Sequence, residues 1–250
     1  MTRPLAVLIL AAGQGKRMED PDMSKVMYEV GGKPMVDHVL EVALKLQPQR
    51  TLVIVGWKKD SVIQHIAKSH TSIEFVEQAE QLGTGHAVRQ TEELLKDFSG
   101  HVLILSGDVP LLTGSTTSAL IGYHCTSNAA ATVLTAELRD PSGYGRIIRN
   151  KDGSVKKIVE DKDATAKEKK IKEINTGIYV FQSRELFQGL KDLKRNNTQG
   201  EYYLTDVFEY FWSNKWRVSA VRALDAFEVI GINDAGQLQR AQEVLALRRG

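Results

Sequence analysis

Residues 5–18 read LAVLILAAGQGKRM, an apolar run followed by two glycines and two cations. The run Leu5–Leu10 has the length and composition of a buried β-strand. Gly13 and Gly15 follow where this strand ends, and small residues there let the backbone turn sharply. Since open α/β sheets bind ligands at the carboxyl ends of their strands, this junction is the first candidate for a ligand-binding loop.

Apolar runs and segments of helical period alternate through the first 136 residues. They predict strands at Thr51–Val55, Ile73–Val76, Val102–Leu105 and Ala131–Thr135, and helices at Met35–Leu46, Asp60–His70, Gly85–Leu95 and Ser115–Ser127. This alternation is typical of βαβ units, whose crossovers place helices on both faces of a mostly parallel sheet. The sequence therefore predicts an α/β fold.

The sequence pattern changes after residue 136, where glycines separate shorter β-rich runs. The pattern predicts strands at Arg146–Arg149, Val155–Val159, Ile174–Phe181 and Val218–Arg222, and helices at Leu204–Trp212 and Asp234–Arg248. We expect one domain over 1–233, with a nucleotide part at about 1–136 and a small β-rich lobe at about 137–225. Residues 234–250 are expected to form a C-terminal helix.

Composition narrows the class of protein. The 250 residues include 33 Lys+Arg and 31 Asp+Glu, a net charge of only +2, which argues against an electrostatic nucleic-acid binder. Cys125 is the single cysteine, and no charged leader followed by a long apolar stretch precedes the first motif. We therefore expect a cytoplasmic protein without a secretory signal. No apolar run approaches the ~20 residues that span a bilayer, so no membrane partner is expected.

The glycine loop fails two familiar phosphate-binding patterns. A dinucleotide fingerprint needs a third glycine where Met18 stands, and a Walker A loop needs Ser or Thr after its lysine, where Arg17 stands. What remains is a loop of small residues whose backbone N–H groups can approach phosphate oxygens. Arg17 can add a forked contact and Lys25 a point charge. A plain glycine turn beside solvated cations is the alternative.

Seven strings in order resemble the sugar-1-phosphate nucleotidyltransferase family. They are the loop at 10–18 with SKV at 24–26, QAEQLGTGHA at 78–87, GDVPL at 107–111, GYGRI at 143–147, EINTG at 173–177, QGEYYLTD at 199–206 and GIN at 231–233. Within the family they are most similar to the uridylyltransferase domains of bifunctional uridylyltransferase/acetyltransferase enzymes. The resemblance covers nearly the whole chain.

This resemblance implies a Rossmann-like nucleotidyltransferase fold, a mostly parallel mixed sheet with helices on both faces and a small β-rich sugar-binding lobe. It implies Mg²⁺-dependent transfer of UMP from UTP to N-acetyl-α-D-glucosamine 1-phosphate. The products are pyrophosphate and UDP-N-acetylglucosamine, a peptidoglycan precursor. A phosphate monoester with a second pKa near ~6 is already ionised at neutral pH, so the nucleophile needs no general base. Another sugar 1-phosphate or NTP, and a catalytically silent nucleotide-binding module, remain alternatives.

The resemblance also assigns roles to residues. Arg17 and Lys25 correspond to the catalytic cations, and Asp108 and Asn233 to the Mg²⁺ ligands. The implied nucleotide-binding residues are Leu10, Ala11, Ala12, Gly13, Gly15, Lys25, Gln78, Gly83 and Thr84. The implied sugar-binding residues are Gly145, Glu160, Asn175, Tyr203 and Thr205. An amide such as that of Gln78 both donates and accepts, which suits the O4 and N3–H edge of uracil.

Read alone, these residues have plainer interpretations. Asp108 is then a turn or helix-cap aspartate before Pro110, Asn233 a helix cap and Gln78 a surface glutamine. Only the matched strings give them functional weight.

The chain departs from the family pattern in three places. Lys16 replaces the usual Thr or Ser, and Ser24 stands where proline commonly precedes the lysine. No hexapeptide β-helix repeat follows, so no acetyl-CoA chemistry is predicted. Without that half we expect a monomer or weak oligomer.

Overall fold

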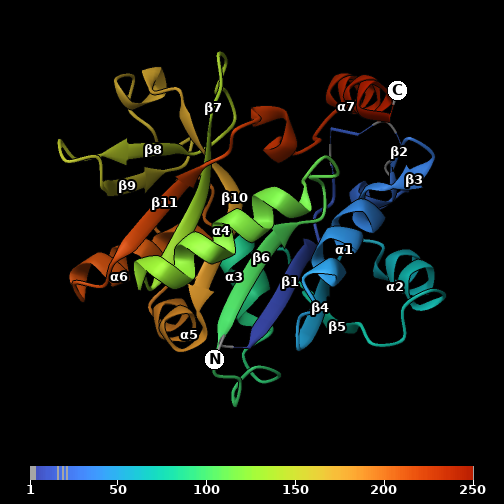
Figure 1. The fold of residues 1–250 in the computed structure, drawn as a ribbon, viewed down its shortest axis with the longest axis horizontal. Helices are drawn as coiled ribbons and strands as arrows, with labels where there is room; N and C mark the ends of the chain where they lie inside the picture. The colour runs from blue at the N-terminus through green and yellow to red at the C-terminus, as the bar shows by residue number, and fades with distance from the viewer. Residues whose placement is uncertain (1–3, 16, 19, 21, 250) are drawn as a thin grey trace.

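The computed structural model describes residues 4–15, 17–18, 20 and 22–249, and these residues build one nine-stranded sheet (Figure 1). Its main path is ordered β11-β7-β10-β6-β1-β4-β5. These strands are β1 Leu5–Ala11, β4 Arg50–Val55, β5 Glu74–Glu77, β6 His101–Ser106, β7 Ala131–Glu137, β10 Glu173–Gln182 and β11 Val218–Arg222. Each pairs in parallel with its neighbours except β10, which runs antiparallel to both β6 and β7.

Strand β1 shows why the sheet is covered on both faces. Ala6 and Leu8 belong to one apolar cluster, Val7 and Ile9 to the other, and all four are fully buried. Successive side chains of a strand point to opposite faces, so a continuous apolar run needs cover on both.

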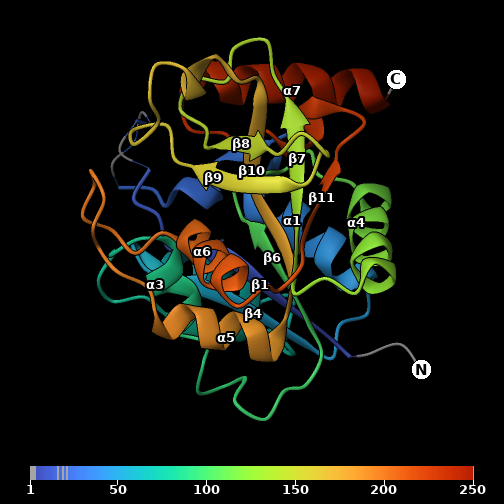
Figure 2. The same cartoon turned by 90° about the vertical axis from the view of Figure 1, so that its left-hand side faces the viewer.

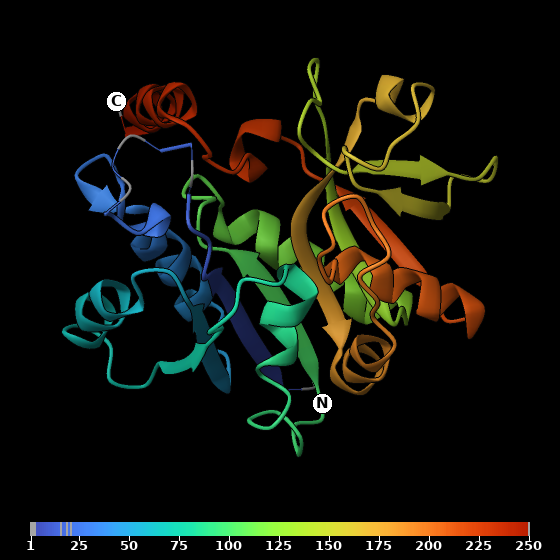
Figure 3. The ribbon, with the colours of Figure 1, turned by 180° about the vertical axis from the view of Figure 1, so that it is seen from behind.

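Helices α1 Met35–Lys45, α2 Lys59–Ala67 and α4 Gly114–Ser127 cover the face toward the viewer in Figure 1. Helices α3 Thr84–Arg89, α5 Ser183–Lys191 and α6 Val207–Ser213 cover the opposite face (Figure 3). Among the described residues, no helix has the length and apolarity needed to cross a membrane. The predicted α/β fold class is confirmed.

Local differences from the prediction have local causes. The helix expected at Gly85–Leu95 ends at Arg89, and turns follow it. There the Thr91 hydroxyl donates to the Val88 carbonyl at 2.7 Å, a local hydrogen bond that competes with helix continuation. Helix α5, which the sequence reading missed, begins directly after β10. The short hairpin of β2 Glu29–Val30 and β3 Lys33–Pro34 was also not expected.

Two structures flank the carboxyl ends of β1, β4 and β6, at the upper edge of Figure 1. On one side, α7 Ala235–Arg249 packs beside β2 through a small apolar cluster that includes Val30, Met35 and Ile232. On the other, the hairpin of β8 Arg146–Arg149 and β9 Val155–Val159 projects from β10, as Figures 1 and 2 show. The segment predicted as a lobe thus contributes β10 and β11 to the main sheet, and its boundary at residue 136 stays a prediction about function.

Candidate active site

A cavity of about 300 Å³ lies at the carboxyl ends of β1 and β6. It is lined by Leu10, Ala11, Ala12, Gly13, Lys25, Val26, Gln78, Gln81, Gly83, Thr84, Ala87, Ser106, Asp108 and Glu201. Every predicted nucleotide-binding residue except Gly15 is therefore at this cavity, together with the predicted metal ligand Asp108.

The loop after β1 is fixed by its neighbours. The Gly107 amide donates to the Leu10 carbonyl at 2.9 Å, and the Trp57 amide donates to the Ala12 carbonyl at 3.2 Å. Gly15 has φ +62°, and a Cβ there would lie 2.8 Å from the Lys25 Cβ. Only glycine combines this conformation with so close an approach, so Gly15 lets Lys25 lie against the loop.

Lys25 joins the two predicted metal ligands. Its Nζ donates to Asp108 Oδ2 and, at 2.8 Å, to Asn233 Oδ1. The Asn233 Nδ2 donates to the Gly231 carbonyl at 3.0 Å, so the amide oxygen faces the lysine. The Ile232 amide donates to the Asp108 carbonyl at 2.9 Å, which ties the segment before α7 to the end of β6. Residues distant in the sequence are thereby held at one point.

This arrangement suits a hard divalent cation. Two oxygen atoms from Asp108 and Asn233 converge on one positive charge. Within the described residues, no group of three or more His, Cys, Asp and Glu side chains is placed to hold a metal. A site with one or two protein oxygens, completed by substrate phosphates and water, is the usual way in which proteins bind Mg²⁺. Nucleotidyl transfer generally uses such a cation to neutralise phosphate charge.

The structure does not bring every predicted cation to the cavity. Arg17 is exposed and does not line it, and Lys16 lies outside the described residues.

Tyr144 belongs to the GYGRI string but was given no role in the sequence analysis. It lies near Asp108. Burial, reinforced by the Asp108 charge, raises the pKa of the Tyr144 hydroxyl to about 12. This phenol therefore stays protonated beside the candidate metal ligands.

Gln78 lines the cavity and is only 3% exposed, so the surface-glutamine interpretation is wrong. Its Nε2 donates to the Gly83 carbonyl at 3.0 Å and lies 3.2 Å from His86 Nδ1. Burial lowers the pKa of His86, which favours the neutral ring as hydrogen-bond acceptor. In the tautomer whose Nδ1 accepts, both amide hydrogens of Gln78 are engaged, and among the described residues its Oε1 has no hydrogen-bond donor.

Three hydrogen bonds join the loop within residues 78–87 to the segment that carries Tyr203 and Thr205. The Tyr202 amide donates to the Leu82 carbonyl at 2.8 Å, and the Gly85 amide donates back to the Tyr202 carbonyl at 2.8 Å. The Leu204 amide donates to the Thr84 hydroxyl at 3.1 Å. These bonds hold two of the quoted strings, 78–87 and 199–206, side by side.

Four of the predicted sugar residues, Gly145, Glu160, Asn175 and Thr205, form a connected set. The Thr205 hydroxyl donates to Glu160 Oε1 at 3.0 Å, and the Asn175 amide donates to the Gly145 carbonyl at 2.8 Å. A Cβ on Gly145 would lie 3.3 Å from Glu160 Oε2 and 3.4 Å from the Asn175 Cβ. Asn175 is buried, and its Nδ2 donates to the Tyr179 hydroxyl at 2.7 Å.

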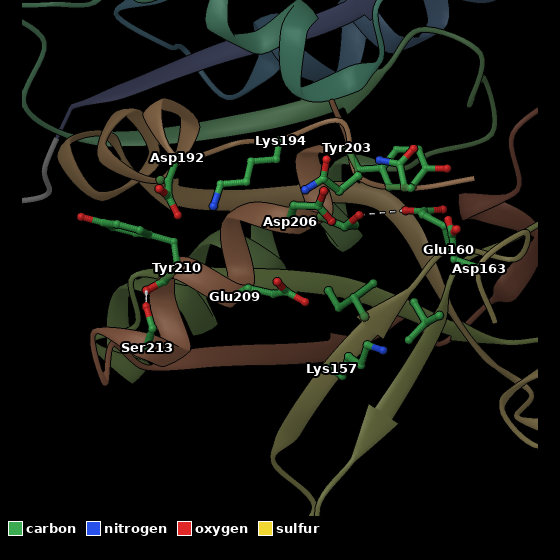
Figure 4. A pocket seen from close by; sticks show the side chains of 16 residues that line it. Lys157, Glu160, Asp163, Asp192, Lys194, Tyr203, Asp206, Glu209, Tyr210 and Ser213 are labelled. Carbon is green, nitrogen blue, oxygen red and sulfur yellow. Dashed lines mark hydrogen bonds between the residues drawn. The ribbon is translucent and has the colours of Figure 1, made fainter. Parts of the chain in front are cut away.

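A second cavity, of about 620 Å³, is lined by Glu160, Tyr203 and Thr205 (Figure 4). Its wall is acidic, since Asp163, Asp206 and Glu209 also face it. Burial raises the pKa of Glu160, and burial with the charge of Glu209 raises that of Asp206 to about 6. These carboxylates stand in surroundings that disfavour their ionised forms.

A nucleotidyl transferase family model matches residues 6–241 of this chain. The chain belongs to the nucleotidyl transferase family. It is 47% identical over 241 residues to a bifunctional protein GlmU of Streptococcus uberis, covering 96% of this chain and 52% of that protein. It is 46% identical to the bifunctional protein GlmU of Streptococcus pyogenes serotype M12, with 96% and 57% covered, and of serotype M5, with 96% and 52%. The chain spans about half the length of these curated relatives. The family resemblance drawn from the seven strings is confirmed.

Sequence reasoning about this nucleotidyl transferase missed several cavity residues. Gln81 and Glu201 line the nucleotide cavity and stand inside strings that were quoted without giving them a role. Ser106 also lines it, one residue before the GDVPL string. Asp206 ends the QGEYYLTD string. The signal was their place within or beside matched strings, but only the fold shows which of them face a cavity.

Proposed function

We propose that this chain transfers UMP from UTP to N-acetyl-α-D-glucosamine 1-phosphate with Mg²⁺, as a sugar-1-phosphate uridylyltransferase. The observation that carries the proposal is the convergence of Lys25, Asp108 and Asn233 at a cavity that Gln78 also lines. The hydrogen bonds through Tyr202 connect that cavity with the set around Glu160. Family membership supports the reaction type.

In the proposed reaction, a phosphate oxygen of the sugar 1-phosphate attacks the α-phosphorus of UTP. A new P–O bond forms, the bond from the α-phosphorus to the bridging oxygen breaks, and pyrophosphate leaves with the electron pair. The nucleophile is already an anion, so the protein's task is to bring two polyanions together. In this proposal Lys25 and Arg17 offset that charge, and backbone N–H groups of the loop at Ala12 and Gly13 bind phosphate oxygens.

Asp108 and Asn233 would hold Mg²⁺ through a carboxylate oxygen and an amide oxygen. When bound, the metal neutralises phosphate charge and aligns the triphosphate. The hydrogen bond from Asn233 Nδ2 to the Gly231 carbonyl keeps its oxygen directed toward the site. Tyr144, protonated beside Asp108, adds no negative charge there.

Gln78 would select the base through its amide oxygen. Since its Nε2 is occupied by Gly83 and His86, the free Oε1 is the group available to the nucleotide. That oxygen accepts from the N3–H of uracil, whereas N3 of cytosine carries no hydrogen. Gln78→Ala should therefore narrow the preference for UTP over CTP, with Gln64→Ala, at an exposed glutamine on α2, as the control. An equal loss with both nucleotides would mean that Gln78 only packs.

Glu160 and Asn175 would bind hydroxyl and acetamido groups of the sugar, with Gly145 giving backbone access and Tyr203 and Thr205 closing the site. A site that hydrogen-bonds a substrate group rejects analogues lacking it strongly. Glucosamine 1-phosphate, which lacks the acetyl carbonyl and carries a positive amine, and glucose 1-phosphate should both react slowly.

The deciding experiment measures pyrophosphate release across a panel of NTPs and sugar 1-phosphates, with and without Mg²⁺. The proposal expects the highest kcat/KM for UTP with N-acetylglucosamine 1-phosphate, dependent on Mg²⁺. If glucose 1-phosphate reacts as efficiently as N-acetylglucosamine 1-phosphate, the assignment of the sugar acceptor is wrong, and the broader nucleotidyltransferase reaction takes its place. No release with any pair would favour a silent nucleotide-binding module.

Three further predictions complete the proposal. We expect the chain to act in the cytoplasm, as its single cysteine suggests, and to be a monomer or weak oligomer. We also expect residues up to about 136 to bind the nucleotide and residues 137–225 to bind the sugar. Sedimentation of the purified chain tests the oligomeric state directly.

A further inference from the structure

The Lys25 side chain lies where a bound metal would have to be. It starts from the short 3₁₀ helix Lys25–Met27, is only 13% exposed, and has Gly15 packed against its Cβ. Its Nζ donates at once to Asp108 Oδ2 and Asn233 Oδ1, the two oxygens assigned to the metal. Two oxygens that ligate one Mg²⁺ each lie about 2.0–2.1 Å from it, which leaves no room for an ammonium between them.

The ammonium and the metal therefore exclude each other at this point. Both are cations, and both are attracted by the same carboxylate and amide oxygen. The lysine also lines the nucleotide cavity, so phosphate oxygens arriving there offer it a second anionic partner.

We propose that Lys25 is an internal counter-ion that competes with the divalent metal for Asp108 and Asn233, and that nucleotide phosphates draw it away when they bind. The proposal rests on the metal site assigned under the proposed function. It makes metal and nucleotide binding mutually dependent, because whichever binds first favours release of the lysine for the other. In the free protein, Lys25 holds the metal ligands together and keeps metal affinity low.

The simpler alternative is that any nearby positive charge lowers metal affinity. Arg17 separates the two explanations. It belongs to the same loop region and carries the same charge, but it is exposed and does not line the cavity. If only contact matters, removing the Lys25 charge will tighten metal binding and removing the Arg17 charge will not.

The first experiment titrates Mn²⁺ alone into the purified chain without nucleotide, following free Mn²⁺ by electron paramagnetic resonance. Lys25→Met, which keeps the side-chain length, should bind Mn²⁺ about tenfold more tightly than wild type, within the usual range of coupling. Arg17→Met should stay within about twofold of wild type. Adding Asp108→Ala to Lys25→Met should abolish the gain.

The outcomes separate the two assignments. Unchanged or weaker Mn²⁺ binding in Lys25→Met, or an equal gain in Arg17→Met, would overturn the counter-ion role while leaving the metal ligands in place. A gain that survives Asp108→Ala would show that the metal binds elsewhere, which overturns the assigned metal site and this inference with it.

A second measurement uses the wild-type chain and so does not depend on a variant folding. Brief acetylation of amines, read by mass spectrometry, reports how accessible each lysine is. Mg²⁺ without nucleotide should increase labelling of Lys25, since the metal displaces its Nζ. Lys33, whose Nζ is paired with Glu41 Oε1 at 2.6 Å, is the matched control and should not change. Unchanged or reduced labelling of Lys25 would overturn the proposal.

Discussion

The proposed nucleotide side of this molecule, around Lys25 and Asp108, and its proposed acceptor side for the sugar phosphate, around Glu160 and Asn175, are built by different means. On the nucleotide side, backbone loops at the ends of parallel strands surround the cavity, and a single ammonium holds two oxygen ligands from distant segments. On the acceptor side, polar side chains are hydrogen-bonded to one another, as Thr205 is to Glu160 and Asn175 to Tyr179. Ionic interactions hold the first region together, and hydrogen bonds between side chains hold the second.

The difference predicts how each region responds to substitution. Removing a charge from the nucleotide side should affect the chemical step, because the charges it meets grow in the transition state. Removing a member of the acceptor network should affect sugar binding and folding together, because a buried partner is left unsatisfied. The hydrogen bonds of Tyr202 connect the two regions, so only substitutions away from that contact separate them cleanly.

The largest expected effect tests the charged side. Asp108→Ala should lower turnover by about 10³-fold or more, since it removes the only carboxylate assigned to the metal. The thermal midpoint should change little, because one partly exposed ion pair contributes little to stability. Pyrophosphate release and a thermal melt measure the two quantities. Asp140→Ala is the control, since within the described part of the chain that exposed side chain bonds only to its neighbour Ser142. Normal Mg²⁺-supported turnover in Asp108→Ala would break the assignment.

The next effect tests the hydrogen-bonded side. Asn175→Ala should raise the KM for the sugar phosphate by about 10–100-fold and compress the preference for the acetylated sugar. It should also lower the free energy of unfolding by about 1–3 kcal/mol, because the buried Tyr179 hydroxyl loses its donor. Steady-state kinetics and urea denaturation measure both. Asn150→Ala, on the exposed β8–β9 turn, should change neither. A loss confined to kcat would contradict the distinction between the two sides.

The sequence carried more information about local strands and loops than about contacts between distant segments. The run LAVLILAAGQG marked β1 and its loop because a continuous apolar strand ending in glycines has one usual place in an α/β sheet. The contact of Lys25 with Asn233 depends on α7 packing beside β2, which no local pattern encodes. Likewise, Asp206 appeared only as the end of a matched string, and its burial among other carboxylates follows from the fold.

Asp206, which lines the cavity on the acceptor side, should have a smaller and pH-dependent effect on stability. It tests the comparison between the two sides further. Burial raises its pKa to about 6 from the ordinary 3.8. Between these values the folded chain keeps a proton that the unfolded chain has lost, so this group lowers stability as pH rises through that window, and the cost stays constant above it. Asp206→Asn removes the cost, and it breaks no helix cap because the side chain makes no capping hydrogen bond.

Thermal or urea unfolding of Asp206→Asn and wild type should therefore coincide near pH 3.8. The variant should become more stable by on the order of 1 kcal/mol above pH 6, after allowance for solvent screening. Asp140→Asn serves as the control, since Ser142 lowers the pKa of that exposed carboxyl and the pH dependence should have the opposite sign. An advantage that is the same at every pH would exclude ionisation as its cause.

The smallest expected effect lies beside Lys25, where Ser24 replaces the proline of the family pattern. Ser24 is fully buried with φ −63° and ψ 135°, and proline fixes φ near −65°. Among the described residues, neither its amide nor its hydroxyl has a hydrogen-bond partner, so proline removes no bond that they supply. Ser24→Pro should raise the free energy of unfolding by about 0.4–1 kcal/mol by restricting the unfolded chain.

Ser24→Ala is the control, because it removes only the hydroxyl. Urea denaturation of both variants separates the backbone effect of proline from the effect of removing an unpartnered polar group. Because Ser24 lies on the charged side, away from the Glu160 network, the KM for the sugar phosphate should be the same in both variants. A destabilised Ser24→Pro would show that the serine backbone at this loop has a partner that proline removes.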